Sequence, residues 1–98
     1  MITSKQRAYL RSMANGMNSI IQVGKGGVTP ELTEAFNEAL EARELVKANV
    51  LDNNLLDARE VAQIIAERTR SEVIQVIGNR FVLYRKCRKP GFKSQYEI

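Results

Sequence analysis

One junction constrains the fold of this chain more than any other stretch: the segment IQVGKGGVTPEL, Ile21 to Leu32. It passes from a short apolar run through three glycines and one lysine into a helix start. Thr29 is a suitable N-cap, and Pro30 falls at the first helical position, where its missing N–H costs nothing. The segment therefore predicts a strand, a tight loop and a helix in direct succession, which is a building unit of α/β folds.

The remaining sequence continues this alternation. Further helices are predicted to begin at Thr3 or Ser4 and at Asp57, where residues that favour N-caps precede helical patterns. Short runs rich in branched apolar residues predict strands at 19–23, 44–51, 72–77 and 81–85. Two successive β-α-β units predict parallel pairing, and Gly78-Asn79 predicts a closing hairpin. We expect an α/β domain over residues 1–86, order α-β-α-β-α-β-β, with a four-stranded mixed sheet packed with three helices.

Composition narrows the class of protein. The 98 residues fit one domain, and no apolar run is long enough for a membrane span. A single cysteine, Cys87, excludes an internal disulfide framework, so we expect a cytoplasmic protein with a reduced thiol. The chain has no histidine, which is the commonest general base and metal ligand. We therefore expect no enzyme activity, no metal site and no cofactor.

Charge is distributed unevenly along the chain. Residues 1–30 carry four bases and no acid, residues 31–60 carry eight acids against three bases, and residues 61–98 carry eight bases against three acids. If the two ends meet, the protein has a basic face and an acidic face, as a polyanion binder needs. A solvated surface with a mild excess of bases is the alternative. Residues 87–98 form a basic tail that we expect to be extended and partly mobile.

The glycine loop has the features of a phosphate contact. The N–H groups and positive dipole of a helix N-terminus attract phosphate, and glycines let it approach the backbone. A P-loop does not fit because Lys25 precedes two of the glycines, and a dinucleotide fingerprint does not fit because Thr29 takes its third glycine position. What remains is a G-x-x-G loop, Gly24 to Gly27, of the kind with which KH domains clamp nucleic acid backbones. A plain turn is the alternative.

Three motifs in this order resemble a known family. VGKGGVTPEL, ELVKANVL and QVIGNRFVLYR together resemble the CRM domain (chloroplast RNA splicing and ribosome maturation), in its bacterial stand-alone YhbY-like form. The likeness runs from about Thr3 to Arg85. It implies a fold similar to the C-terminal domain of translation initiation factor three, RNA binding through the loop, and a role in ribosome assembly on ribosomal RNA of large-subunit precursors.

The resemblance also suggests which residues contact RNA, and the basic cluster after the last strand adds one more. One departure from the family pattern is Asn49, which stands where the family often has a second basic residue, and it puts the contribution of that strand in doubt. Phe81, Tyr84 and Tyr9 are predicted to belong to the core rather than to stack on bases. The predicted RNA-binding residues are Gly24, Lys25, Gly26, Gly27, Lys5, Arg7, Arg11, Lys47, Arg85 and Lys86.

Two other functions remain open at this point. The chain could be a protein–protein module whose acidic helix, with Glu34 and Glu38, meets a basic partner such as a ribosomal protein. It could also be a nucleotide-dependent enzyme, although the failed P-loop match argues against that. In isolation we expect a monomer.

Overall fold

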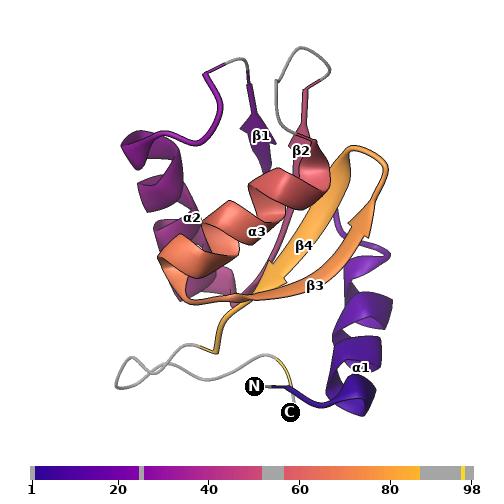
Figure 1. Cartoon of the computed structure of the whole chain (residues 1–98). Coiled ribbons are helices and arrows are strands. Elements are labelled where there is room, and N and C mark those ends of the chain that lie inside the picture. Colours follow the sequence, from indigo (N-terminus) through magenta and orange to yellow (C-terminus); the bar gives the residue numbers. More distant parts are fainter. Residues whose placement is uncertain (1, 25, 52–56, 87–95, 97–98) are drawn as a thin grey trace.

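The computed structural model describes residues 2–24, 26–51, 57–86 and 96. Within these ranges the element order confirms the predicted α/β fold (Figure 1). The four strands form one mixed sheet in the spatial order β1-β2-β4-β3. The elements are α1 (Ser4–Ala14), β1 (Ile21–Val23), α2 (Pro30–Arg43), β2 (Leu45–Val50), α3 (Ala58–Thr69), β3 (Glu72–Ile77) and β4 (Arg80–Tyr84).

The sheet contains one parallel pairing where the sequence predicted two. β1 pairs with β2 in parallel, but β4 lies between β2 and β3 and is antiparallel to both. The prediction that the second β-α-β unit pairs its own strands was therefore wrong. The hairpin turn at Gly78, where φ is +57°, returns β4 along β3. β4 is buried from Phe81 to Tyr84 on both faces, which suits the interior of the sheet better than an edge.

The predicted helix starts are confirmed by their caps. The Thr3 side chain and the Gln6 side chain form a reciprocal capping box. The Thr29 hydroxyl accepts a hydrogen bond from the Leu32 N–H at 3.1 Å. The Asp57 carboxylate accepts one from the Glu60 N–H at 2.8 Å. Each such cap stabilises its helix by about 1 kcal/mol and fixes where the preceding loop ends.

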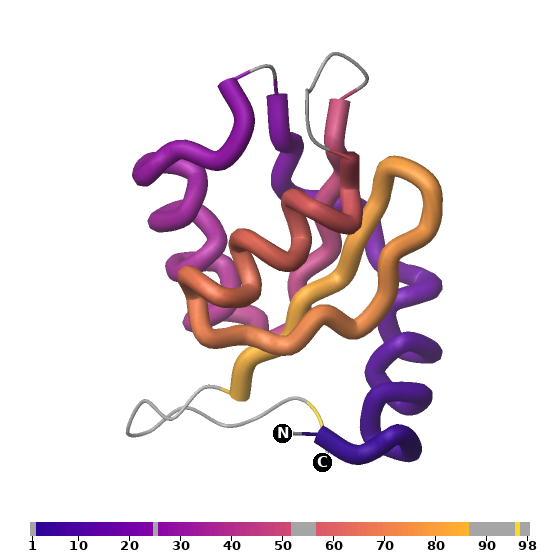
Figure 2. Tube along the Cα trace, in the orientation of Figure 1, coloured from indigo at the N-terminus to yellow at the C-terminus, as the bar shows by residue number. Residues whose placement is uncertain are grey.

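The two faces of the sheet are covered differently. α2 and α3 pack on one face, where the rings of Phe36 and Phe81 stack with centroids 5.8 Å apart. α1 packs on the other face through Leu10 and Ala14. In Figure 2 it stands apart from the α2–α3 pair. Among the described helices only α1 covers this second face, so the described part of the chain leaves some of it open.

Predictions for the aromatic residues are confirmed in two cases of three. Phe81 and Tyr84 are buried, with 1% and 3% of their surface exposed. Tyr9 is 37% exposed, so its assignment to the core was wrong. The described residues of the predicted tail are limited to Tyr96, whose ring meets that of Tyr84 edge to face at 6.3 Å. The prediction of a mobile tail therefore falls on residues outside the described ranges.

Tyr84 is expected to make stability fall in alkaline solution. Burial, the Glu44 carboxylate and Tyr96 raise the pKa of Tyr84 from 10.0 to about 12. Between these values the unfolded chain releases a proton that the folded protein keeps, so the free energy of unfolding drops as pH rises. The loss by pH 12 is about 2–3 kcal/mol, while stability below pH 10 is unaffected by this group.

Urea unfolding of the wild type and of Tyr84→Phe at a series of pH values measures this loss. The Tyr84 hydroxyl has no hydrogen-bond partner among the described residues. The phenylalanine variant should therefore be at least as stable as the wild type at neutral pH. It should also keep more of its stability above pH 10. An identical alkaline loss in both proteins would contradict the role of Tyr84.

Candidate nucleic-acid interface

The glycine loop lies where the sequence placed it, between the end of β1 at Val23 and the start of α2 at Pro30. The Gly27 N–H donates to the Gly24 carbonyl at 3.0 Å, which closes a tight turn. Gly27 has a φ of +70°, a region that side chains other than glycine rarely adopt. Lys25, predicted to be the main contact, lies outside the described residues.

The other two glycines are not required by packing. A Cβ added at Gly24 would lie 3.8 Å from Leu51 Cδ1, and one at Gly26 would lie 3.9 Å from Thr29 Cγ2. Both are ordinary contact distances, and neither glycine has a positive φ. The fold can accommodate a small side chain at both positions. Glycine there leaves the loop backbone accessible to a ligand from outside, which fits a phosphate contact.

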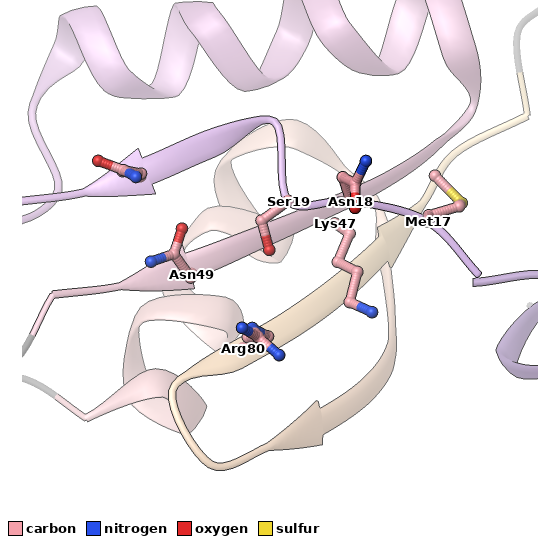
Figure 3. A pocket seen from close by; sticks show the side chains of 7 residues that line it. Met17, Asn18, Ser19, Lys47, Asn49 and Arg80 are labelled. Atoms are coloured by element: carbon pink, nitrogen blue, oxygen red, sulfur yellow. The ribbon is translucent and has the colours of Figure 1, made fainter. Parts of the chain in front are cut away.

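The open part of the second sheet face contains a polar groove of about 370 Å³. Figure 3 shows Lys47 and Asn49 on β2 and Arg80 at the start of β4, with Asn18 and Ser19 coming from the segment before β1. None of the described residues that line it is acidic, so two cations set its charge. The lining residues are Met17, Asn18, Ser19, Gln22, Lys47, Asn49 and Arg80.

The sheet register places the groove next to the glycine loop. Gln22 pairs with Asn49, and Asn49 pairs with Arg80, so these residues form a row across three strands. Cross-strand neighbours share a face of the sheet and lie about 5 Å apart. Gln22, the β1 member of this row, comes two residues before Gly24, which follows the end of β1. The groove therefore reaches the end of the sheet from which the glycine loop leaves.

Lys47 lies on the side of this groove that is next to α1. Its Nζ lies 3.4 Å from the carbonyl oxygen of Ala14, in the last turn of α1. The negative end of the α1 dipole favours a cation there. This contact is long for a hydrogen bond, so the ammonium keeps donors for another acceptor.

The predicted cations of α1 divide into two kinds. Lys5 and Arg11 are exposed. Arg7 is half-buried, donates to the Val73 carbonyl and lies 3.8 Å from the Glu72 carboxylate. Arg7 therefore fastens α1 to β3, whereas Lys5 and Arg11 face solvent.

Arg85 and Lys86 lie at the far end of β4 from Arg80. The Arg85 guanidinium donates to the Asn37 side-chain oxygen at 2.9 Å, to the Thr69 carbonyl at 2.8 Å and to the Asn37 carbonyl at 3.2 Å. These bonds join β4 to α2 and to the end of α3. Lys86 is exposed beside it. The structure thus places Lys47 in the groove, at the middle of the sheet, and places Arg85 and Lys86 at the end of the sheet away from the glycine loop.

Several lining residues were absent from the sequence prediction. Arg80, Gln22, Asn18 and Ser19 all line the groove but are not among the predicted RNA-binding residues. Asn49 replaces the second basic residue that the family often has on this strand. The register puts Arg80 directly beside Asn49, so the neighbouring strand supplies that charge. The one signal in the sequence is the spacing of Lys47 and Asn49. They are two positions apart on β2, and side chains two positions apart on a strand lie on the same face.

A small α/β module with a glycine loop at a helix start beside a cationic open sheet face has the arrangement that a polyanion binder needs. The model of the CRS1/YhbY (CRM) domain matches residues 2–85. The chain therefore belongs to this family, as its motifs predicted.

Similar proteins agree with this assignment. "Probable RNA-binding protein YqeI" from Bacillus subtilis is 45% identical over 89 residues, covering 91% of this chain and 93% of that protein. A protein named "RNA-binding protein" from Haemophilus influenzae is 27% identical over 84 residues, covering 86% of this chain and 85% of its own. The solution structure of the hypothetical protein SAV1595 from Staphylococcus aureus is similar with a TM-score of 0.77 and 44% identity, covering 92% and 94% of the two chains.

Proposed function

We propose that this protein binds RNA through the glycine loop and the adjacent cationic groove, without catalysis and without a cofactor. The observation that carries the proposal is that two features lie near each other in the sheet: the glycine loop, and a groove lined by Lys47 and Arg80 with no acid among its described lining residues. Cations on one surface neutralise phosphates and release counterions, which supplies most of the affinity for nucleic acid. The names of the relatives from Bacillus subtilis and Haemophilus influenzae support the same polymer.

The biological target we propose is ribosomal RNA in precursors of the large ribosomal subunit, bound by a monomer in the cytoplasm during assembly. The resemblance of the three sequence motifs supports this target. Sucrose-gradient sedimentation of a cell extract tests it, because a bound factor migrates with the precursors. Recovery of the protein only at the top of the gradient would contradict an assembly role and leave RNA binding as such intact.

In the described ranges, the helices are too short or too polar to span a membrane.

Reversing the charge of the loop should weaken RNA binding. We expect Lys25→Glu to lower affinity for single-stranded RNA about tenfold and to flatten the dependence of log K on log salt by about one unit. The reason is that one phosphate contact is replaced by repulsion. Filter binding across a range of salt concentrations measures both quantities.

Arg68→Glu is the matched control for this experiment. It makes the same change in net charge, and Arg68 is exposed in the last turn of α3, near the end of the sheet away from the loop. This variant should bind RNA nearly as the wild type does. If Lys25→Glu and Arg68→Glu weaken binding equally, overall charge rather than the loop carries the affinity.

A further inference from the structure

We propose that the groove on the open sheet face takes one unpaired nucleotide of the RNA, with the amides of Asn18 and Asn49 on the edge of its base and Lys47 and Arg80 on the flanking phosphates. This deepens the proposed function and rests on it. It turns the groove from a general basic surface into a site that distinguishes single strands from duplexes and one base from another.

The size of the groove favours a single nucleotide. Its volume of about 370 Å³ lies at the lower end of the range of small-molecule sites. An RNA duplex keeps its bases stacked inside and shows its major-groove edges only in a deep, narrow groove. A base can enter a hollow of this volume only after it has left the stack. Preference for single-stranded RNA therefore follows from the shape alone.

The lining chemistry favours recognition of a base edge by hydrogen bonds. Each primary amide presents two donors and an acceptor in one plane, the arrangement that complements the edge of a base. Asn49 is half-buried and Asn18 is exposed, and both line the same groove.

Aromatic stacking, the usual alternative, has no support in this groove. None of the described lining residues is aromatic. The rings of Phe36, Phe81 and Tyr84 are buried in the two cores. Bases held here would be distinguished by their hydrogen-bonding groups rather than by their stacking strength.

The cations are placed to hold phosphates on both sides of such a base. Arg80 is exposed in the row that contains Asn49, and Lys47 lies two residues along β2 on the same face. Among the described residues, the Lys47 ammonium makes one hydrogen-bond contact, the long one of 3.4 Å to the Ala14 carbonyl, which a phosphate oxygen can replace. Gln22, the β1 member of this row, comes two residues before Gly24 in the chain. An RNA strand whose backbone is held by the glycine loop can therefore continue directly into the groove.

Binding of short RNA homopolymers of the four bases, and of one duplex, tests the proposal by fluorescence anisotropy. The wild type should bind single strands about tenfold more tightly than the duplex and should prefer one homopolymer by about tenfold, the effect of one good base contact. The double variant Asn18→Ala/Asn49→Ala should remove the base preference and keep the salt dependence. Lys47→Gln and Arg80→Gln should each lower the salt slope by about 0.7 and keep the base preference.

Two residues on α3, which packs on the other face of the sheet, supply the controls. Gln63→Ala removes an exposed amide, and Arg68→Gln removes an exposed cation. Both should bind all five RNAs as the wild type does. Thermal melting verifies that each variant is folded, and Arg80→Gln is the safest of them because Arg80 is exposed.

The outcomes separate this inference from the function on which it rests. Equal affinity of the wild type for all five RNAs would overturn the nucleotide site. So would groove variants that bind as the wild type does while Lys25→Glu is weakened, and in that case RNA binding through the loop stands. A wild type that binds none of the RNAs overturns both.

Discussion

Replacing Arg85 by methionine is expected to lower the free energy of unfolding by about 2–4 kcal/mol and to leave the RNA affinity of the folded protein unchanged. The guanidinium makes three hydrogen bonds of 2.8–3.2 Å to Asn37 and Thr69. Methionine fills a similar volume but leaves those partly buried acceptors without their donor. The Glu41 carboxylate, 3.5 Å away and more than half exposed, adds little because water screens it.

Urea unfolding measures the stability loss, and filter binding below the unfolding range measures affinity. Arg68→Met is the matched control: it removes an exposed cation from the last turn of α3 and should change stability by less than about 0.5 kcal/mol. A double-mutant cycle with Asn37→Ala should show a coupling of about 1–2 kcal/mol. A stable Arg85→Met protein with weakened RNA binding would instead place Arg85 in the RNA interface, as the sequence motif implied.

Truncating Phe81 to alanine is expected to cost about 3–5 kcal/mol, the largest single effect among these predictions. Phe81 is 1% exposed and its ring stacks on that of Phe36. Its removal therefore leaves a cavity between β4 and α2. Small domains have about 5–15 kcal/mol in total, so the variant will be partly unfolded at modest temperature. RNA binding should fall only in proportion to the folded fraction, because Phe81 is on the face opposite the groove.

Two further variants keep this test decisive if Phe81→Ala does not fold. Phe81→Leu retains most of the volume and should cost less than about 1.5 kcal/mol. Ile77→Ala, on the neighbouring strand and 63% exposed, should be nearly neutral. A loss below about 1 kcal/mol for Phe81→Ala would show that the α2–β4 contact contributes little to stability.

The elements and their limits could be predicted because their signals are local. Thr29 with Pro30, and Asp57 with Glu60, mark helix starts within one turn of sequence, and the structure confirms each cap. The position of β4 could not be predicted in this way. Its apolar run fits an interior strand of any sheet, and the choice of partners depends on packing with helices that are distant in sequence. The likeness to the C-terminal domain of translation initiation factor three stays a prediction.

The candidate site likewise has one part that local sequence indicates and one part that depends on residues distant in the chain. The glycine loop is one continuous motif, so the sequence indicates it directly. The groove exists only because β1, β2 and β4 bring Gln22, Asn49 and Arg80 side by side. No local pattern connects these three residues. For the same reason the sequence does not indicate that Arg85, a predicted RNA contact, donates hydrogen bonds to acceptors on α2 and α3.

The interior position of β4 also has a consequence for how the protein is made. β4 lies between β2 and β3 and pairs with both of them. It is nevertheless the last of the described strands in the chain, at Arg80–Tyr84. While the chain is being synthesised, β2 and β3 can emerge without the strand that joins them. We therefore expect folding to wait until nearly the whole domain has been translated, and a chain interrupted before residue 80 to expose apolar strand edges that invite aggregation.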